Sequence, residues 1–208
     1  MRRIEKGQEP AAWTRHRLTP GAVYEPSDDL RKSLLEEQGY ICAYCMRRIP
    51  VKDGNSNETS RIEHILCRER HADLQLDYRN MVICCPGAVD GAFHCDKSKG
   101  NRDITFDLFQ QRCIDTLSYG SGDGTIRSSD NTYDRELNEV LNLNHALLKR
   151  NRSMTLKGVI NRLNQRHSWK KSQIRTLLNE WDSKDGDGYY KPYNGIVVWF
   201  LKKRLEQK

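Results

Sequence analysis

The fold is decided by residues 61–100, RIEHILCRERHADLQLDYRNMVICCPGAVDGAFHCDKSKG, together with CAYC at residues 42–45. Two β-prone runs, residues 60–62 and 80–84, precede a segment that begins with an acidic residue, 96–100. Acidic residues are favoured in the first turn of a helix. We therefore predict an α+β fold whose central unit consists of two short strands followed by a helix.

The cysteines of this region form two separated pairs, a pattern typical of a structural zinc site. The expected Zn²⁺ ligands are Cys42, Cys45, Cys85 and Cys95. Alternation along the second β-prone run leaves open whether Cys84 replaces Cys85, and His94 is an alternative to Cys95. Ordinary buried or redox thiols are the competing interpretation, but a redox pair is expected near a βαβ pattern. Cys67 and Cys113 are predicted to be packing thiols.

Acidic side chains and a histidine flank the two predicted strands. Glu63 and Asp96 offer the oxygen ligands that Mg²⁺, or Mn²⁺, prefers, and we expect both to hold such an ion. His64 is the predicted general base, because a neutral imidazole with a pKa near 6.5 takes a proton from water at cellular pH. Asn80 is expected to fix the loop that carries His64 through hydrogen bonds. His71 is a rival base, although no carboxylate precedes it.

This set of side chains predicts the hydrolysis of phosphodiester bonds. The metal would polarise the phosphate and stabilise the leaving oxygen. Three cations are expected to bind the non-bridging phosphate oxygens: Lys99, Arg68 and Arg70.

The order CxxC, EH, N, C and CDxxKG resembles that of the HNH, or ββα-metal, nucleases. More closely, the chain is similar to the HNH subunit of Septu-type antiphage systems, the PtuB-like proteins that also accompany retron reverse transcriptases. The resemblance runs along the whole chain and includes MRRIEKGQEP at residues 1–10, LNLNHALLK at 141–149 and PYNGIVVWF at 192–200. It implies a zinc-stabilised ββα-metal core with a hairpin and a mainly helical C-terminal region.

The resemblance also implies a role for each matched residue. His64 matches the family's general base, and Glu63 matches the metal-binding acid before it. Asn80 matches the central asparagine. Asp96 stands at the final position, where histidine or asparagine is commoner, and we expect the carboxylate to be a tolerated variant because it is a good magnesium ligand.

The resemblance implies a metal-dependent endonuclease that cleaves DNA, with tRNA as the alternative substrate. The expected partners are a PtuA-like ATPase subunit and, in a retron-linked system, the reverse transcriptase with its RNA and DNA. Two other hypotheses are a catalytically inactive zinc-bearing adaptor and a standalone restriction-type HNH nuclease. The joint presence of the four matched residues favours an active enzyme, and the lack of a recognisable specificity domain disfavours the standalone form.

We predict four regions along the chain. These are an N-terminal arm (1–26), a zinc-stabilised nuclease core (27–110), a β-hairpin (111–130) and a basic helical region (131–208). Prolines favour an extended arm with at most one short helical turn, which wraps its own domain or docks on another protein. Further helices are expected at residues 27–38, 133–143, 155–164, 170–181 and 193–206. One more helix is expected to begin at about residue 144.

Charge and composition restrict the setting of the protein. The net charge is +7, and residues 145–208 alone carry 15 Lys and Arg against 5 Asp and Glu. Such a basic helical region is suited to a phosphate backbone, while a solvated helix face and an acidic partner are the alternatives. Seven cysteines, no signal peptide and no apolar run near 18 residues predict a reducing cytoplasm and no membrane segment.

Overall fold

A computed structural model of the chain describes residues 1–50, 59–89, 91–165 and 169–207. Its strands are β1 (Arg61–His64), β2 (Met81–Cys84), β3 (Ala88–Val89), β4 (Ala92–Phe93), β5 (Leu117–Tyr119) and β6 (Ile126–Ser128). Its α-helices are α1 (Ala11–Arg17), α2 (Asp28–Glu37), α3 (Cys95–Lys99), α4 (Gln111–Asp115), α5 (Asn131–Arg135), α6 (Ala146–Gln165), α7 (Lys171–Asp182) and α8 (Asn194–Glu206). Short 3₁₀ turns occupy Ala72–Leu74 and Tyr78–Asn80, and a π-helical turn occupies Glu136–Val140. The predicted α+β class is confirmed.

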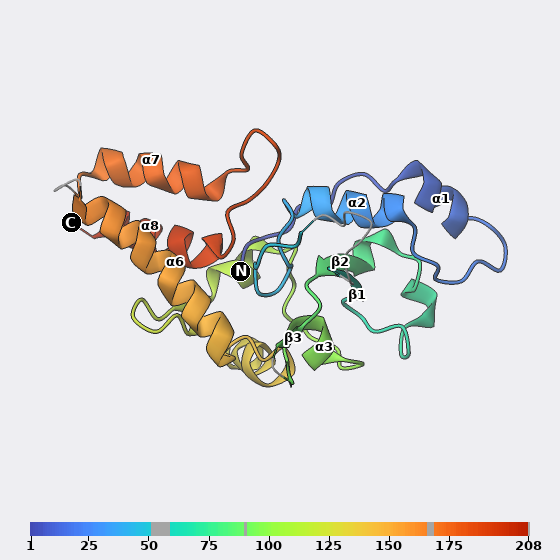
Figure 1. Cartoon of the computed structure of the whole chain (residues 1–208). Coiled ribbons are helices and arrows are strands. Elements are labelled where there is room, and N and C mark those ends of the chain that lie inside the picture. Colours follow the sequence, from blue (N-terminus) through green and yellow to red (C-terminus); the bar gives the residue numbers. More distant parts are fainter. Residues whose placement is uncertain (51–58, 90, 166–168, 208) are drawn as a thin grey trace.

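The strands form three separate two-stranded antiparallel sheets. As Figure 1 shows, β1 and β2 lie with α1 and α2 in one half of the molecule, and α6, α7 and α8 lie in the other half. In the β1–β2 sheet, Glu63 is opposite Val82 and His64 is opposite Met81. Helix α3 follows β1 and β2 along the chain as predicted, but the β3–β4 hairpin, which was not predicted, stands between β2 and α3.

Helix α2 supports the β1–β2 sheet and begins where the sequence predicts. The Ser27 hydroxyl accepts a hydrogen bond from Leu30 N at 3.2 Å, which satisfies one of the free amides of the first turn. Leu30, Leu34 and Leu35 are buried on its inner face. Beyond the helix end, Gly39 has a φ of +58°, a conformation that glycine adopts without steric cost.

The N-terminal arm contains more helix than predicted. Helix α1 has seven residues, so the expectation of at most one short turn was wrong. Two alanines with high helix propensity follow Pro10, which stands immediately before the helix. The helix buries Trp13, whose Nε1 donates to Leu76 O at 3.0 Å. The arm therefore wraps its own protein.

The predicted hairpin is present, but its first part is helical. Strands β5 and β6 pair antiparallel around the glycine-rich turn, whereas residues 111–115 form α4. Gly124 has a φ of +73°, and a Cβ at this position would collide with the carbonyl oxygen of Lys149. The turn thus packs closely against α6.

Helix α6 is a single helix of 20 residues, so the prediction of two shorter helices in this region was wrong. Its polar residues Arg152 and Ser153 are buried instead of marking a break. Arg152 donates to Gly124 O at 2.6 Å and to Leu143 O at 2.8 Å, and Ser153 Oγ donates to Gly122 O at 2.8 Å. These bonds replace water as partners and allow the helix to continue.

The other C-terminal helices lie close to their predicted positions, with one local difference. The helix expected at 133–143 is α5 followed by the π-helical turn, in which Leu141 N donates to Glu136 O at 2.9 Å. The buried Glu136 carboxylate accepts from Thr105 N at 2.8 Å and Phe106 N at 2.9 Å. This turn is thereby tied to the chain that leaves α3.

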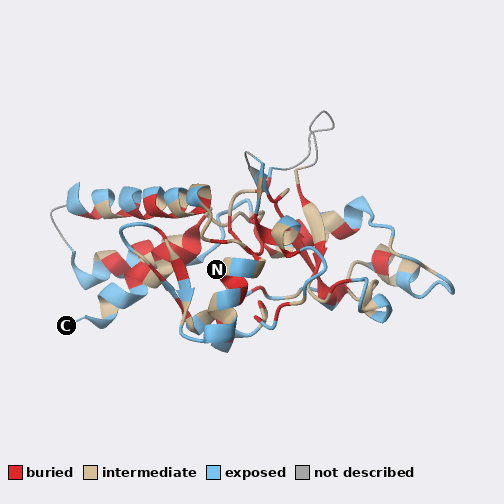
Figure 2. Ribbon diagram, turned by 90° about the horizontal axis from the view of Figure 1, so that it is seen from below, coloured by how far each residue is buried: buried red, intermediate tan, exposed pale blue. Residues whose placement is uncertain are grey.

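One hydrophobic cluster extends from Met1 to Leu201 and contains residues of all four predicted regions. Buried residues lie on the inward sides of the helices in both halves of the molecule (Figure 2). Phe200 is buried and Trp199 packs at the cluster's edge, so both aromatic residues of α8 contribute to the core. No helix in the described ranges combines the length and apolar character needed to cross a membrane.

Candidate functional site

Four buried cysteines converge at the start of α3. The Sγ atoms of Cys42, Cys45, Cys85 and Cys95 all lie within 4.8 Å of one another. The Cys42 and Cys95 sulfurs are 3.8 Å apart, and those of Cys45 and Cys85 are 3.7 Å apart. These four thiols, which we call the cysteine cluster, are placed to hold one metal ion such as zinc.

The ionisation of the cysteine cluster suits the binding of a cation. Burial alone would raise the pKa of the Cys42 thiol, but hydrogen bonds from neighbouring thiols hold it well below its usual value. A thiolate surrounded by thiols is the donor set that zinc binds. Neither Cys84 nor His94 belongs to the group, although both are buried. His94 instead lies beside it, with Nδ1 3.1 Å from the Cys95 sulfur.

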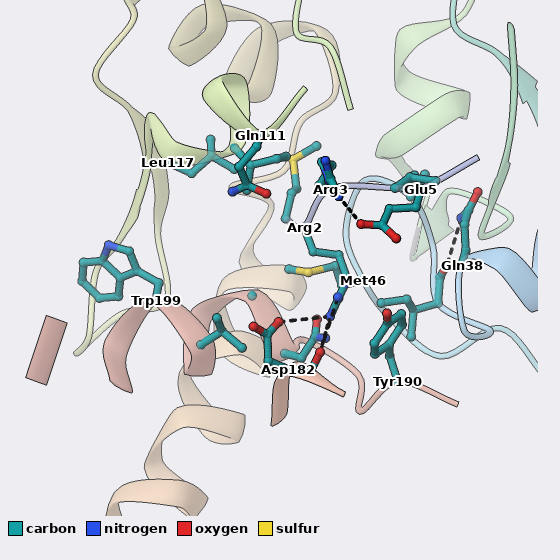
Figure 3. Close-up of a pocket in the computed structure, with 18 of the residues that line it drawn as sticks. Arg2, Arg3, Glu5, Gln38, Met46, Gln111, Leu117, Asp182, Tyr190 and Trp199 are labelled. Carbon is teal, nitrogen blue, oxygen red and sulfur yellow. Dashed lines mark hydrogen bonds and ion pairs between the residues drawn. The ribbon is translucent and has the colours of Figure 1, made fainter. Parts of the chain in front are cut away.

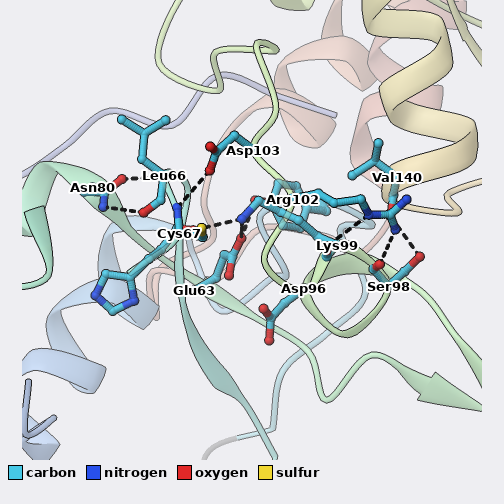
Figure 4. Close-up of polar contacts among 12 residues, drawn as sticks. Glu63, Leu66, Cys67, Asn80, Asp96, Ser98, Lys99, Arg102, Asp103 and Val140 are labelled. Carbon is cyan, nitrogen blue, oxygen red and sulfur yellow. Dashed lines mark hydrogen bonds and ion pairs between the residues drawn. The ribbon is translucent and has the colours of Figure 1, made fainter. Parts of the chain in front are cut away.

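Glu63 lies at the centre of a second, polar cluster next to the cysteines. Its Oε1 accepts from Lys99 Nζ at 2.8 Å and from the Tyr44 hydroxyl at 3.0 Å. Figure 4 shows Lys99 extending from α3 towards Glu63. Because Tyr44 stands between Cys42 and Cys45, the CAYC motif connects the cysteine cluster directly to this carboxylate.

Asp96 on α3 lies close to Glu63. Burial and a hydrogen bond with the Asp96 carboxyl group raise the pKa of Glu63 to about 8, and the positive charge of Lys99 opposes this. The Asp96 carboxylate also accepts from Arg61 Nε at 2.5 Å. Figure 4 shows the two carboxyl groups near each other. Two neighbouring carboxyl groups provide the oxygen donors that a hard divalent cation prefers, and such an ion would relieve their mutual repulsion.

His64 is buried and held in one orientation. Its Nε2 lies 2.9 Å from the carbonyl oxygen of Gln75, which can only accept a hydrogen bond. Nε2 therefore carries the proton, and Nδ1 carries the lone pair. Burial lowers the pKa of His64 to about 4, so the imidazole is neutral at physiological pH. Lys99 also contacts the backbone of this residue, with Nζ donating to His64 O at 3.0 Å.

Asn80 fixes the loop after His64, as predicted. Its Oδ1 accepts from Leu66 N at 2.9 Å, and its Nδ2 donates to Leu66 O at 2.9 Å and to Leu74 O at 3.4 Å. The backbone oxygen of Asn80 accepts from Ile65 N at 3.0 Å. Asn80 thus joins the two sides of the loop between β1 and β2 (Figure 4).

Replacing Asn80 with aspartate is expected to destabilise the protein by about 1–3 kcal/mol. Aspartate retains the acceptor for Leu66 N, but it loses both donors and sets a negative charge against two carbonyl oxygens. Thermal and urea unfolding of the variant measure the loss. Asn161→Asp, at an exposed position on α6, is the control and is expected to be nearly neutral; equal effects of the two substitutions would contradict a structural role for Asn80.

The three predicted phosphate ligands have different environments. Lys99 is 1% exposed, and its ammonium donates to His64 O at 3.0 Å as well as to Glu63. It points into the protein, which contradicts the prediction that it binds phosphate. Arg70 is exposed and lies 3.4 Å from Asp103, which also contacts the rival base His71 at 3.2 Å. Arg68 is exposed beside the ring of Tyr24.

Three residues of this site were not identified from the sequence: Tyr44, Tyr24 and Gln75. The position of Tyr44 inside CAYC was the only available signal. Gln75 acts on His64 through a backbone oxygen, which has no signature in the side-chain sequence. Tyr24 comes from the N-terminal arm, and only the fold brings it close.

A cavity of about 980 Å³ forms a groove apart from the catalytic candidates. Figure 3 shows it between the first residues of the chain and α8, with Arg2, Asp182, Tyr190 and Trp199 among its lining residues. Glu63, His64, Asn80 and Asp96 do not line it.

No protein-family model matches this chain, and no curated protein sequence matches it.

Proposed function

We propose that the protein is a metal-dependent HNH-type endonuclease. One observation supports this most strongly: the carboxyl groups of Glu63 and Asp96 neighbour each other, and His64, next to Glu63 on β1, is buried and neutral with the lone pair on Nδ1. Glu63 and His64 lie on β1, and Asp96 lies on α3, which follows β2 after the short β3–β4 hairpin. An adaptor without chemistry has no need of this arrangement.

In the proposed reaction, His64 Nδ1 takes a proton from a water molecule whose oxygen attacks the phosphorus. The bond from phosphorus to the leaving sugar oxygen breaks, and that oxygen acquires a proton from solvent. Gln75 keeps the imidazole in the required tautomer, and Asn80 keeps its loop in place. A Mg²⁺ or Mn²⁺ ion held by Glu63 and Asp96 would polarise the phosphate and stabilise the leaving oxygen.

Zinc in the cysteine cluster is the proposed structural cofactor. The four sulfurs give the all-thiolate coordination typical of closed structural sites. Through Tyr44, the cluster also determines where Glu63 lies. The seven cysteines are all free thiols, which supports a reducing, cytoplasmic setting.

Nucleic acid is the proposed substrate, and the exposed cations of the C-terminal helices support it. They include Arg150 and Lys157 on α6, Lys171 and Arg175 on α7, and Lys202 and Lys203 on α8. Such charges bind a phosphate backbone without sequence preference and with strong salt dependence. Not all the basic residues contribute, since Arg152 is buried and Arg162 is paired with Glu180 at 3.1 Å.

The proposed partner is a PtuA-like ATPase subunit of a defence complex, and in a retron-linked system the reverse transcriptase with its RNA and DNA. The resemblance to PtuB-like proteins supports these partners. A cytoplasmic nuclease without sequence preference would be toxic, so the partner is proposed to restrain the site.

The test is to assay the purified chain, alone and co-expressed with the neighbouring ATPase, on plasmid DNA and on tRNA. Cleavage is expected with Mg²⁺ or Mn²⁺ and is expected to stop in EDTA. Asp96→Ala is expected to lower the rate by about 10²-fold or more, because the bound cation supplies several kcal/mol of transition-state stabilisation.

Asp187→Ala is the matched control, because Asp187 is an exposed aspartate far along the chain in the turn between α7 and α8. It is expected to cleave like the wild type. If no preparation cleaves either substrate, or if Asp96→Ala cleaves like the wild type, the nuclease proposal fails and the adaptor hypothesis replaces it.

A further inference from the structure

We propose that Tyr24 of the N-terminal arm is a positioning residue of the candidate site, with a ring that orients the His64 imidazole and supports the Arg68 guanidinium where it binds a substrate phosphate. The inference rests on the proposed function and extends the site beyond residues 61–100.

Tyr24 makes ring contacts with both of these side chains. Its ring centroid lies 4.7 Å from that of His64, with the planes at 79°. This edge-to-face contact restricts rotation of the imidazole, which the Gln75 carbonyl holds at Nε2. The Arg68 guanidinium carbon is 4.5 Å from the Tyr24 centroid, within the range of a cation–π contact. One aromatic ring therefore links the proposed base to a cation.

The segment that carries Tyr24 is held firmly against the site. Tyr24 N donates to the side-chain oxygen of Gln75 at 3.4 Å, and the backbone oxygen of the same Gln75 binds His64. Trp13, which is 1% exposed, packs edge-on against Tyr24 with centroids 6.2 Å apart. His16 Nε2 lies 2.8 Å from Val23 O and closes the loop between them. The arm thus fixes the position of the Tyr24 ring.

The charges around Tyr24 fit a phosphate chain. Burial raises the pKa of the Tyr24 hydroxyl, and the charges that also act on it are those of Arg68, Arg31, Asp96 and Arg61. Arg61 contacts Asp96, and Arg31 donates to Ser60 O at 2.9 Å. In the described part of the chain Arg68 forms no ion pair, and it is exposed. It is the cation best placed to contact a phosphate beside the one that is cleaved.

The kinetic test compares Tyr24→Ala, Tyr24→Phe and Arg68→Gln with the wild type on whichever nucleic acid the wild type cleaves. Tyr24→Ala is expected to lower kcat by about 10²-fold, because a slightly misplaced base is costly. Tyr24→Phe retains the aromatic ring and is expected to have a kcat close to that of the wild type. Arg68→Gln is expected to raise KM with kcat nearly unchanged, and to reduce the slope of log affinity against log salt by about 1.

Tyr189→Ala is the matched control. Tyr189 is also half-buried, stacks on the ring of Tyr40 at 4.1 Å and has Arg48 4.9 Å above it, but it contacts none of the site residues. It is expected to leave kcat and KM unchanged. A similar loss in Tyr189→Ala and Tyr24→Ala would overturn the inference, because the effect would then be general destabilisation.

A second measurement does not depend on cleavage. In ¹⁵N-labelled protein at constant pH, the imidazole signals of His64, assigned with His64→Ala, are expected to report one tautomer with the proton on Nε2. Tyr24→Ala is expected to produce a mixture of tautomers, and Tyr24→Phe the single form. An unchanged tautomer in Tyr24→Ala would overturn the positioning role even if the protein is a nuclease. A mixture of His64 tautomers in Tyr24→Ala, in a protein that cleaves no nucleic acid, would support the positioning role of Tyr24 while the proposed nuclease function fails.

Discussion

Replacing His64 with alanine is expected to lower the rate of nucleic-acid cleavage by about 10²–10⁴-fold, the usual contribution of a general base. The Gln75 carbonyl fixes the proton on Nε2, so only Nδ1 can accept a proton from water. Alanine removes that acceptor and leaves Glu63 and Asp96 in place. Single-turnover rates with saturating Mg²⁺ measure the effect on the chemical step, and binding of the uncleaved substrate in EDTA should be nearly unchanged.

His71→Ala is the control for this prediction. His71 lies in the same loop, but its Nε2 is 3.2 Å from Asp103, which engages it in a separate contact. Its loss is expected to leave most of the activity. Equal cleavage by the wild type and His64→Ala would exclude His64 as the base, and inactivity of His71→Ala alone would give that role to His71.

The parts of the site that the sequence predicted are those that depend on spacing over short distances. The close pair Cys42 and Cys45 and the wider pair Cys85 and Cys95 require little of the fold beyond one close approach of two loops. The assignment of Asn80 also follows from local structure, since its partner Leu66 lies in the loop that Asn80 closes. The order of β1, β2 and α3 was also predicted, whereas the β3–β4 hairpin between β2 and α3 was not.

The parts that were missed depend on where side chains point. Lys99 follows Asp96 by three residues, and the sequence does not show that its ammonium turns inward to Glu63. A polar residue in a helix, such as Arg152, looks exposed until its carbonyl partners are known. Tyr24 reaches His64 only because α1 buries Trp13 and returns the chain to the sheet. Such contacts arise from tertiary packing and not from periodicity or spacing.

Removing the zinc proposed for the cysteine cluster is expected to have the largest effect on stability, on the order of 10 kcal/mol of folding free energy. The cluster lies within the single hydrophobic cluster, and its four sulfurs join the CAYC turn to the end of β2 and the start of α3. Without an ion, a thiolate remains buried among thiols, which is costly. Cys45→Ser, or a strong chelator, is therefore expected to abolish cooperative thermal unfolding and to release one zinc per chain, which metal analysis measures.

Cys67→Ser is the matched control, because Cys67 is also a buried thiol but is not a member of the cluster. It is expected to retain one zinc per chain and to unfold cooperatively near the wild-type temperature. The same experiment links the structural site to activity. Because the Tyr44 hydroxyl connects Glu63 to the CAYC turn, loss of the metal is also expected to abolish cleavage. A wild-type protein that contains no zinc, and whose unfolding a chelator does not alter, would contradict the structural role of the cluster and leave the position of Glu63 dependent on Lys99 and packing alone.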